Sequence, residues 1–232
     1  MKKGFVIAID GPVAAGKGTI AQLLAKKLNA YYLTTGLLYR SITLYCLDKA
    51  IPLSDEKAVE RVLPEIAIVI TDGRVFLNQK EVTDRLMTRK VDELVPMIAN
   101  QSSVRKYLLP VQRNIGQQHI MQGKIVILEG RDIATKVFPD ALVKIYLTSD
   151  VEVRAKRRFV QMQKRLGDIV KFEDVLRDTR KRDERDMFGP LAYLVSDPQK
   201  YGYTIVDNTH LTEQQTFEQI LKIIEKKGKL DQ

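Results

Sequence analysis

The chain has 232 residues, 44% of them hydrophobic, so it is long enough to bury a core and is not intrinsically disordered. A single cysteine excludes a disulfide framework and favours a reducing cytoplasm, and no run of about 18 apolar residues suggests a membrane span. The 38 lysines and arginines against 29 acids indicate an anionic partner, whose class the net charge alone does not decide.

Short apolar strands alternate with helices along the chain. An apolar run at residues 5–9 ends at Gly-Pro, and a helix with apolar residues at helical spacing follows Lys17. A second strand is expected at residues 31–33 and a second helix at residues 37–47. Further strands are expected at residues 125–128, 143–147 and 203–206. This alternation predicts an α/β fold with a three-layer, doubly wound parallel sheet.

One segment interrupts the alternation. Two apolar runs at residues 66–71 and 74–78 flank Asp72-Gly73, a pair typical of β-hairpin turns. With the helix that follows, this hairpin is interpreted as an insertion into the α/β core. The expected division is an insertion at about residues 61–97 and a core of residues 1–60 and 98–232.

The strongest motif lies between the first strand and the first helix. The residues from Gly11 to Lys17 fit the phosphate-binding loop Gly-x-x-x-x-Gly-Lys, in the required order of strand, loop and helix. In such a loop the backbone N–H groups surround phosphate oxygens, and the lysine reaches the β- and γ-phosphates. The candidate ATP-binding residues are Gly11, Pro12, Val13, Ala14, Ala15, Gly16, Lys17, Gly18 and Thr19.

The expected magnesium site differs from the usual pattern. Gly18 follows the lysine where this motif has a serine or threonine that ligates Mg²⁺, and the hydroxyl comes one residue later, at Thr19. An apolar strand ends at Glu129, as in carboxylate sites that orient Mg²⁺ beside a phosphate loop. We therefore expect Glu129 to hold Mg²⁺ through water and Thr19 to serve a phosphate. The chain lacks an Asn-Lys-x-Asp guanine-binding motif, which argues against a signalling GTPase.

Two arginines follow the predicted ends of strands. They are Arg40 and Arg131. Ligands of doubly wound sheets bind beyond the carboxyl ends of the strands, and arginine recognises phosphate with two parallel hydrogen bonds. The pair therefore indicates a second phosphate, that of an acceptor.

Most of the excess positive charge lies in one segment. Residues 154–185 contain twelve lysines and arginines and six acids, so they hold six of the nine excess positive charges. The segment is expected to form two helices joined around Gly167, with Phe159 and Phe172 as its only aromatic residues. Sites that bind single-stranded nucleic acid usually contain more aromatic residues for stacking. We therefore interpret residues 154–189 as a lid that closes over a transferring phosphoryl group.

Five motifs are spread along nearly the whole chain. They are I-A-I-D-G-P-V-A-A-G-K-G-T at 7–19, T-G-L-L-Y-R at 35–40, E-G-R-D-I-A-T-K-V-F-P-D-A at 129–141, V-K-I-Y-L-T-S at 143–149 and R-D-E-R-D at 182–186. Together they resemble the bacterial cytidylate kinases of the nucleoside monophosphate kinase family, and the third is highly specific to that family. The resemblance implies a P-loop kinase with a parallel-sheet core, a small monophosphate-binding insertion and a helical lid.

The resemblance also implies an activity and a set of site residues. The activity is transfer of the ATP γ-phosphoryl group, with Mg²⁺, to CMP or dCMP, and an acceptor phosphate oxygen needs no general base because it is already anionic. The residues that would neutralise the transferring group are Lys17, Arg131, Arg154, Arg157, Arg182 and Arg185. Those that would bind the acceptor are Thr35, Arg40, Arg105, Arg131, Asp132 and Asp186, with Arg40 on its phosphate and Asp186 on its ribose.

The chain departs from the family pattern at four positions, all on the acceptor side. Thr34 stands where the family usually has aspartate, Met87 where it has arginine, Pro96 where it has serine, and Gly189 where it has arginine. The donor side is intact, so the sequence predicts ATP as donor more firmly than CMP as acceptor.

Two alternatives stay open at this point. One is a P-loop kinase with another acceptor, such as UMP or a non-nucleotide phosphate or alcohol. The other is a nucleotide-binding protein without catalysis that grips RNA through the basic lid. The favoured interpretation is a monomeric, cytoplasmic kinase of small nucleotides that binds neither membrane nor nucleic acid.

Overall fold

The structure is a computed structural model that describes residues 4–71, 73–166, 170–189, 191 and 193–230. It divides into two compact units. The first unit consists of Met1–Leu33 and Ile115–Gln232, and the second of Thr34–Asn114. The predicted insertion at residues 61–97 lies inside the second unit, which extends beyond it on both sides.

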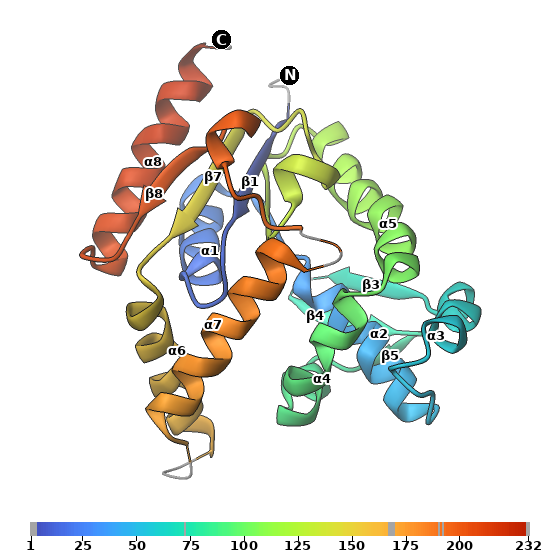
Figure 1. The fold of residues 1–232 in the computed structure, drawn as a ribbon. Helices are drawn as coiled ribbons and strands as arrows, with labels where there is room; N and C mark the ends of the chain where they lie inside the picture. The colour runs from blue at the N-terminus through green and yellow to red at the C-terminus, as the bar shows by residue number, and fades with distance from the viewer. Residues whose placement is uncertain (1–3, 72, 167–169, 190, 192, 231–232) are drawn as a thin grey trace. The chain divides into compact units, whose positions relative to one another are not determined.

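A five-stranded sheet forms the centre of the first unit (Figure 1). Its order is β2-β6-β1-β7-β8, and β1 pairs in parallel with β6 and β7, as β7 does with β8. The strands are β1 (Val6–Asp10), β2 (Tyr31–Thr34), β6 (Val126–Gly130), β7 (Val143–Thr148) and β8 (Thr204–Asp207). The predicted α/β fold with a parallel sheet is confirmed, and each predicted strand lies within one or two residues of the observed one.

Helices cover both faces of this sheet. Helices α1 (Lys17–Leu28) and α8 (Glu213–Leu230) pack on one face, where their apolar residues form a core with Ile7 and Ile9 of β1. Side chains alternate along a strand, so Asp10 points to the opposite face. There it bonds the short π-helix η3 (Ile133–Val137). Asp10 and the start of the phosphate loop therefore lie at the carboxyl end of the central strand.

Two long helices occupy the segment that the sequence predicts to be a lid. Helices α6 (Val151–Leu166) and α7 (Phe172–Phe188) pack against each other, with Phe159 and Phe172 in edge-to-face contact at 5.9 Å between ring centroids. The predicted joint at Gly167 lies outside the described residues. A 3-10 turn, η4 (Pro198–Tyr201), then leads into β8.

The second unit contains the predicted hairpin. Strands β3 (Ile68–Thr71) and β4 (Arg74–Leu77) are antiparallel, which confirms the hairpin, and the short strand β5 (Lys80–Glu81) pairs with β4. Asp72 of the predicted turn lies outside the described residues. The remaining elements are α2 (Gly36–Asp48), α3 (Glu56–Val62), η1 (Leu63–Glu65), η2 (Asp84–Met87), α4 (Arg89–Ala99) and α5 (Ser102–Met121), whose last residues belong to the first unit. Within the described residues, no helix is long and apolar enough to cross a membrane.

Candidate active site

The phosphate loop has a conformation that requires its glycines. Gly11 has φ +147°, and a Cβ added there would lie 2.0 Å from the carbonyl oxygen of Leu147 in β7. Gly16, the residue that precedes α1, has φ +88°, in the left-handed region that side chains rarely adopt. The loop therefore turns tightly from β1 into α1, which is the geometry that exposes backbone N–H groups to phosphate oxygens.

Lys17 is buried at the first position of α1. Its side chain is 5% exposed, and Nζ donates a hydrogen bond to the Pro12 carbonyl at 2.8 Å. Burial, followed by the positive charge of Arg131, lowers the pKa of Lys17 to about 7, although Glu129 acts in the opposite direction. A bound phosphate would supply the negative charge that this ammonium needs.

The pKa values of Lys17 and Arg182 are both lowered by the positive charge of Arg131. The charges of Arg131 and Arg182 both lower the pKa of Lys17, and burial followed by the charge of Arg131 lowers the pKa of Arg182 to about 10. Asp186, 2% exposed, supplies a counter-charge to Arg131: its Oδ2 lies 3.2 Å from Arg131 Nε. Like charges held together in this way attract an anion, and all three residues belong to the set predicted to neutralise a transferring phosphoryl group.

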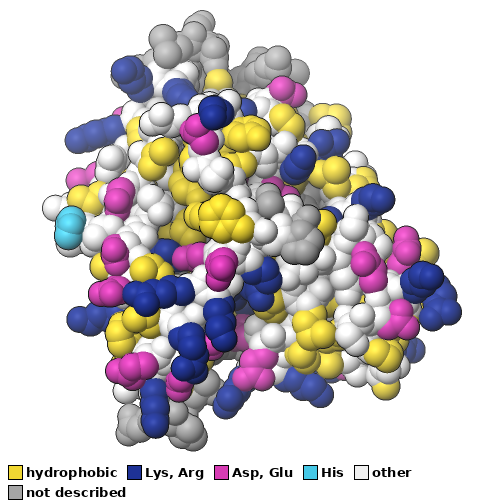
Figure 2. Space-filling model, in the orientation of Figure 1, with side chains coloured by type: hydrophobic (Ala, Val, Ile, Leu, Met, Phe, Trp, Pro, Cys, Tyr) yellow, Lys and Arg dark blue, Asp and Glu magenta, His cyan; other side chains and the backbone are white. Residues whose placement is uncertain are grey.

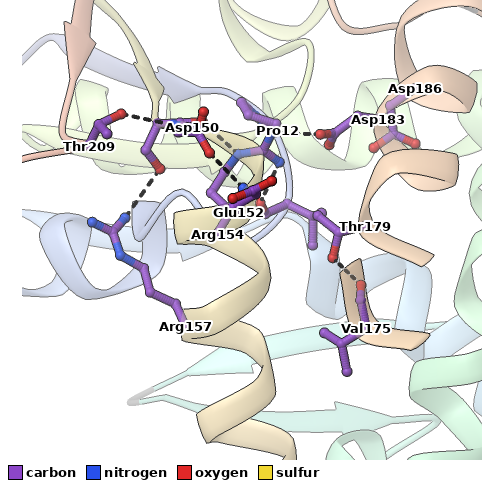
Figure 3. A network of polar contacts seen from close by, with 12 residues as sticks. Pro12, Asp150, Glu152, Arg154, Arg157, Val175, Thr179, Asp183, Asp186 and Thr209 are labelled. Carbon is purple, nitrogen blue, oxygen red and sulfur yellow. Dashed lines mark hydrogen bonds and ion pairs between the residues drawn. The ribbon is translucent and has the colours of Figure 1, made fainter. Parts of the chain in front are cut away.

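Arg154 of α6 connects the phosphate loop to α7. Its Nε donates to the Ser149 carbonyl at 2.8 Å and one Nη to the Val13 carbonyl at 3.2 Å, while the other Nη lies 2.6 Å from Asp183 Oδ2. Figure 3 shows this side chain between the loop at Pro12 and Asp183 of α7. With 5% exposure, Arg154 could contact a phosphate only by exchanging these protein contacts.

Arg157 and Arg185 are also engaged within the first unit. Arg157 donates to Asn208 Oδ1 and to the Asn208 carbonyl, both at 3.0 Å, and Asn208 Nδ2 in turn donates to the Ala15 carbonyl of the phosphate loop. Arg185 Nε lies 3.8 Å from Asp186 Oδ1, and this buried nitrogen makes no hydrogen bond to any described residue. Lys and Arg side chains over α6 and α7 are interspersed with acids (Figure 2), so this surface is not uniformly basic.

Glu129 lies where a magnesium ligand is expected. It is the fourth residue of β6, its Oε1 accepts a hydrogen bond from Tyr32 Oη at 3.4 Å, and a Cβ at Gly18 would lie 3.8 Å from the same oxygen. Across the described ranges, no group of three or more Asp, Glu, His or Cys could enclose a metal ion by itself. A single carboxylate near Gly18, at the start of α1, fits Mg²⁺, which keeps several waters and binds substrate phosphates.

Three predicted acceptor residues lie in the second unit. Thr35, 4% exposed, precedes α2, and Arg40 of that helix donates to the Leu86 carbonyl at 2.8 Å and lies 2.5 Å from Asp92 Oδ1. The Arg105 guanidinium lies over the ring of Tyr39, 5.5 Å from its centroid. Arg105 therefore contacts Tyr39, the residue of α2 that directly precedes Arg40.

The other predicted acceptor residues, Arg131, Asp132 and Asp186, lie in the first unit. Asp186 Oδ1 accepts a hydrogen bond from Tyr193 Oη at 2.7 Å, so both of its oxygens have partners. Gly189, one of the four departures, caps α7, and a Cβ there would lie 2.4 Å from the Arg185 carbonyl oxygen. An arginine would therefore not fit this helix end without a shift of the backbone.

Sequence reasoning missed three polar residues of the first unit. Asp10 accepts hydrogen bonds from the Ile133 and Ala134 N–H groups and from Tyr203 Oη, and Asn208 contacts the phosphate loop as described above. Burial raises the pKa of Asp10 to about 6 against the effect of these hydrogen bonds. A carboxylate that ends a buried strand directly before a phosphate loop was a visible signal for Asp10. No local signal pointed to Tyr203 or Asn208.

Comparisons with known proteins identify similar sequences that are described as cytidylate kinases. The family model described as cytidylate kinase matches residues 7–226. A cytidylate kinase of Carboxydothermus hydrogenoformans is 40% identical over 226 residues, which cover 96% of this chain and 98% of the relative. A cytidylate kinase of Caldanaerobacter subterraneus is 38% identical over 223 residues, with 96% of each chain covered. An uncharacterized protein from Eubacterium ventriosum shares the fold, with a TM-score of 0.53 at 13% identity over 95% of this chain and 98% of that one.

Proposed function

The chain belongs to the cytidylate kinase family, and we propose that it transfers the γ-phosphoryl group of ATP to CMP or dCMP, forming ADP and the corresponding diphosphate. The family match over nearly the full length carries this conclusion. The buried Lys17, whose pKa is lowered beside Arg131, supports it from the structure. A kinase with another acceptor and a non-catalytic RNA-binding protein are not favoured.

The reaction needs positioning and charge neutralisation rather than acid–base chemistry. An oxygen of the acceptor phosphate attacks the γ-phosphorus, the bond from that phosphorus to the β–γ bridging oxygen breaks, and ADP leaves. Negative charge spreads over the equatorial oxygens of the transferring group, and we propose that Lys17, Arg131 and Arg182 face it. Because they are already positioned, little reorganisation is needed as the charge develops.

The remaining lid arginines are proposed to act when both nucleotides are bound. Arg154, Arg157 and Arg185 would exchange contacts with Asp183, Asn208 and Asp186 for phosphate oxygens. Mg²⁺, when bound with ATP, would neutralise the β- and γ-phosphate oxygens, and Glu129 is the residue proposed to hold it, through water.

For the acceptor we propose the residues named from the sequence. Arg40 would bind the acceptor phosphate and Asp186 its ribose, and the full set is Thr35, Arg40, Arg105, Arg131, Asp132 and Asp186. The substrates are small nucleotides. That the chain acts as a monomer in the cytoplasm stays a prediction from the sequence.

A panel of acceptors tests this function. ADP release from ATP is measured with CMP, dCMP, UMP, AMP and GMP in parallel, and salt-dependent RNA binding is measured alongside. We expect the highest kcat/KM with CMP or dCMP. Highest activity on another acceptor would assign a different kinase, and RNA binding with a steep salt dependence but no turnover of any monophosphate would assign a binding protein.

A further inference from the structure

Asp10 is a buried carboxylate to which the mechanism above gives no role. It is fully buried at the end of β1, the central strand of the sheet, so water does not solvate its carboxylate. Instead, Oδ1 accepts from the Ile133 N–H at 2.9 Å, and Oδ2 accepts from the Ala134 N–H at 2.9 Å and from Tyr203 Oη at 2.6 Å. Removing a carboxylate from water is costly unless hydrogen bonds compensate for the lost solvation, so this arrangement calls for a reason.

The two N–H groups belong to the segment that carries Arg131. They are the first two of η3, whose own N-cap residue, Asp132, makes no side-chain capping hydrogen bond. Asp10 therefore caps this helix from a strand more than a hundred residues away in sequence. Because Arg131 lies two residues before Ile133, these bonds fix the backbone from which its side chain extends.

The same residue also fixes the start of the phosphate loop. Asp10 is followed directly by Gly11, whose Cα is packed against the Leu147 carbonyl, and its register partners are Gly130 on one side and Tyr146 on the other. Tyr203 contacts Tyr146 edge-to-face at 5.8 Å between centroids, which holds the hydroxyl against the Asp10 carboxylate. One side chain thus connects the phosphate loop, the Arg131 segment and the residue that precedes β8.

We propose that Asp10, held by Tyr203, is a positioning residue that sets Arg131 relative to Lys17 for phosphoryl transfer. This inference rests on the proposed function, since the reaction is what requires that geometry. Asp10 does not touch the nucleotides itself; it acts through Arg131. Displacement of a catalytic group by about 1 Å can lower a rate on the order of 100-fold, so loss of this cap is expected to lower kcat far more than it raises the KM for ATP.

A graded set of variants tests the inference. Asp10→Asn keeps the shape of the side chain but leaves either the Ile133 or the Ala134 N–H group facing an NH₂ group, and Tyr203→Phe removes only the hydroxyl. We expect kcat to fall on the order of tenfold or more in Asp10→Asn and about threefold in Tyr203→Phe, with the KM for ATP changed by less than about threefold. Circular dichroism and thermal unfolding establish that each variant is folded.

A double-mutant cycle with Arg131→Ala separates positioning from a general structural role. If Asp10 acts through Arg131, Asp10→Asn lowers kcat strongly when Arg131 is present and little when it is absent. Equal losses in both backgrounds, or a normal kcat in both Asp10→Asn and Tyr203→Phe, would overturn the inference. If Asp10→Asn does not fold, the same cycle with Tyr203→Phe decides.

The wild-type chain separates this inference from the proposed function. If the wild type phosphorylates CMP or dCMP but the cycle shows no coupling, only the role of Asp10 is overturned. If the wild type phosphorylates neither, the proposed function fails and the inference fails with it.

Discussion

The first and second units differ in how far their candidate substrate-binding cations are compensated by negative charge. In the first unit, burial and the positive charge of Arg131 lower the pKa of Lys17 to about 7, so its ammonium lacks full compensation. In the second unit, Arg40 already has Asp92 at 2.5 Å and the Leu86 carbonyl at 2.8 Å. The comparison indicates that the first unit can accept the charge of a polyphosphate, whereas an acceptor bound by Arg40, as proposed, would compete with an existing ion pair.

The largest expected effect concerns Lys17. Lys17→Ala removes the charge that is proposed to face the transferring group, and we expect kcat to fall on the order of 100-fold or more with the fold intact. Lys26→Ala, an exposed lysine on the same helix, is the matched control and is expected to turn over normally. Steady-state ADP release measures turnover in both variants. Near-normal turnover in Lys17→Ala would show that Lys17 does not neutralise the transferring group.

The next effect concerns the dependence of stability on pH. The pKa of Lys17 is about 7 in the folded chain and about 10.5 when unperturbed, so the unfolded chain binds more protons between these values. Stability without nucleotide should therefore rise with pH in this window, by about 2 kcal/mol between pH 7.5 and 9.5 relative to Lys17→Met. Urea unfolding of both proteins measures this difference, and saturating ATP should flatten it, because phosphate raises the pKa of the lysine. If the free energy of unfolding of the wild type and of Lys17→Met changed with pH in the same way without nucleotide, the lowered pKa of Lys17 would be contradicted.

A smaller effect is expected from the compensated arginine of the second unit. Arg40→Ala should raise the KM for CMP about tenfold and leave the KM for ATP unchanged, since the residue is proposed to bind only the acceptor phosphate. Arg89→Ala provides the control, because Arg89 is exposed and pairs with Glu93 on α4. Equal changes in both KM values would show that Arg40 is not specific to the acceptor.

The smallest effect concerns Tyr193. Tyr193→Phe removes the 2.7 Å hydrogen bond to Asp186 Oδ1, and if Asp186 binds the ribose as proposed, the carboxylate then bonds a ribose hydroxyl more strongly. We expect the ratio of kcat/KM for CMP over dCMP to rise about threefold, which corresponds to the net free energy of one weak hydrogen bond. Tyr201→Phe, at an exposed tyrosine, should leave the ratio unchanged. An unchanged or lower ratio in Tyr193→Phe would show that the Tyr193 hydrogen bond does not affect recognition of the ribose.

Much of the fold and the donor site could be predicted from the sequence, because local patterns determine them. Apolar strand segments of four to six residues and the glycine spacing from Gly11 to Lys17 can be recognised from neighbouring residues alone. The hairpin at β3 and β4 was likewise visible as two apolar runs around a turn.

The polar contacts that organise the site could not be predicted in this way. Asp10 bonds Ile133 and Tyr203, which are 123 and 193 positions away, and no local pattern encodes such a pairing. The engagement of Arg154 with Asp183 and the phosphate loop also depends on how distant helices pack. The four departures were visible, but only the structure shows that the end of α7 at Gly189 has no room for a Cβ.

The fate of the γ-phosphoryl group tests the proposed transfer most directly. ³¹P NMR of the wild-type chain with ATP, Mg²⁺ and CMP follows every phosphorus at once. We predict that ADP and CDP appear in equal amounts, without inorganic phosphate. Release of inorganic phosphate instead of CDP, or no change in the ATP signals, would contradict phosphoryl transfer to CMP.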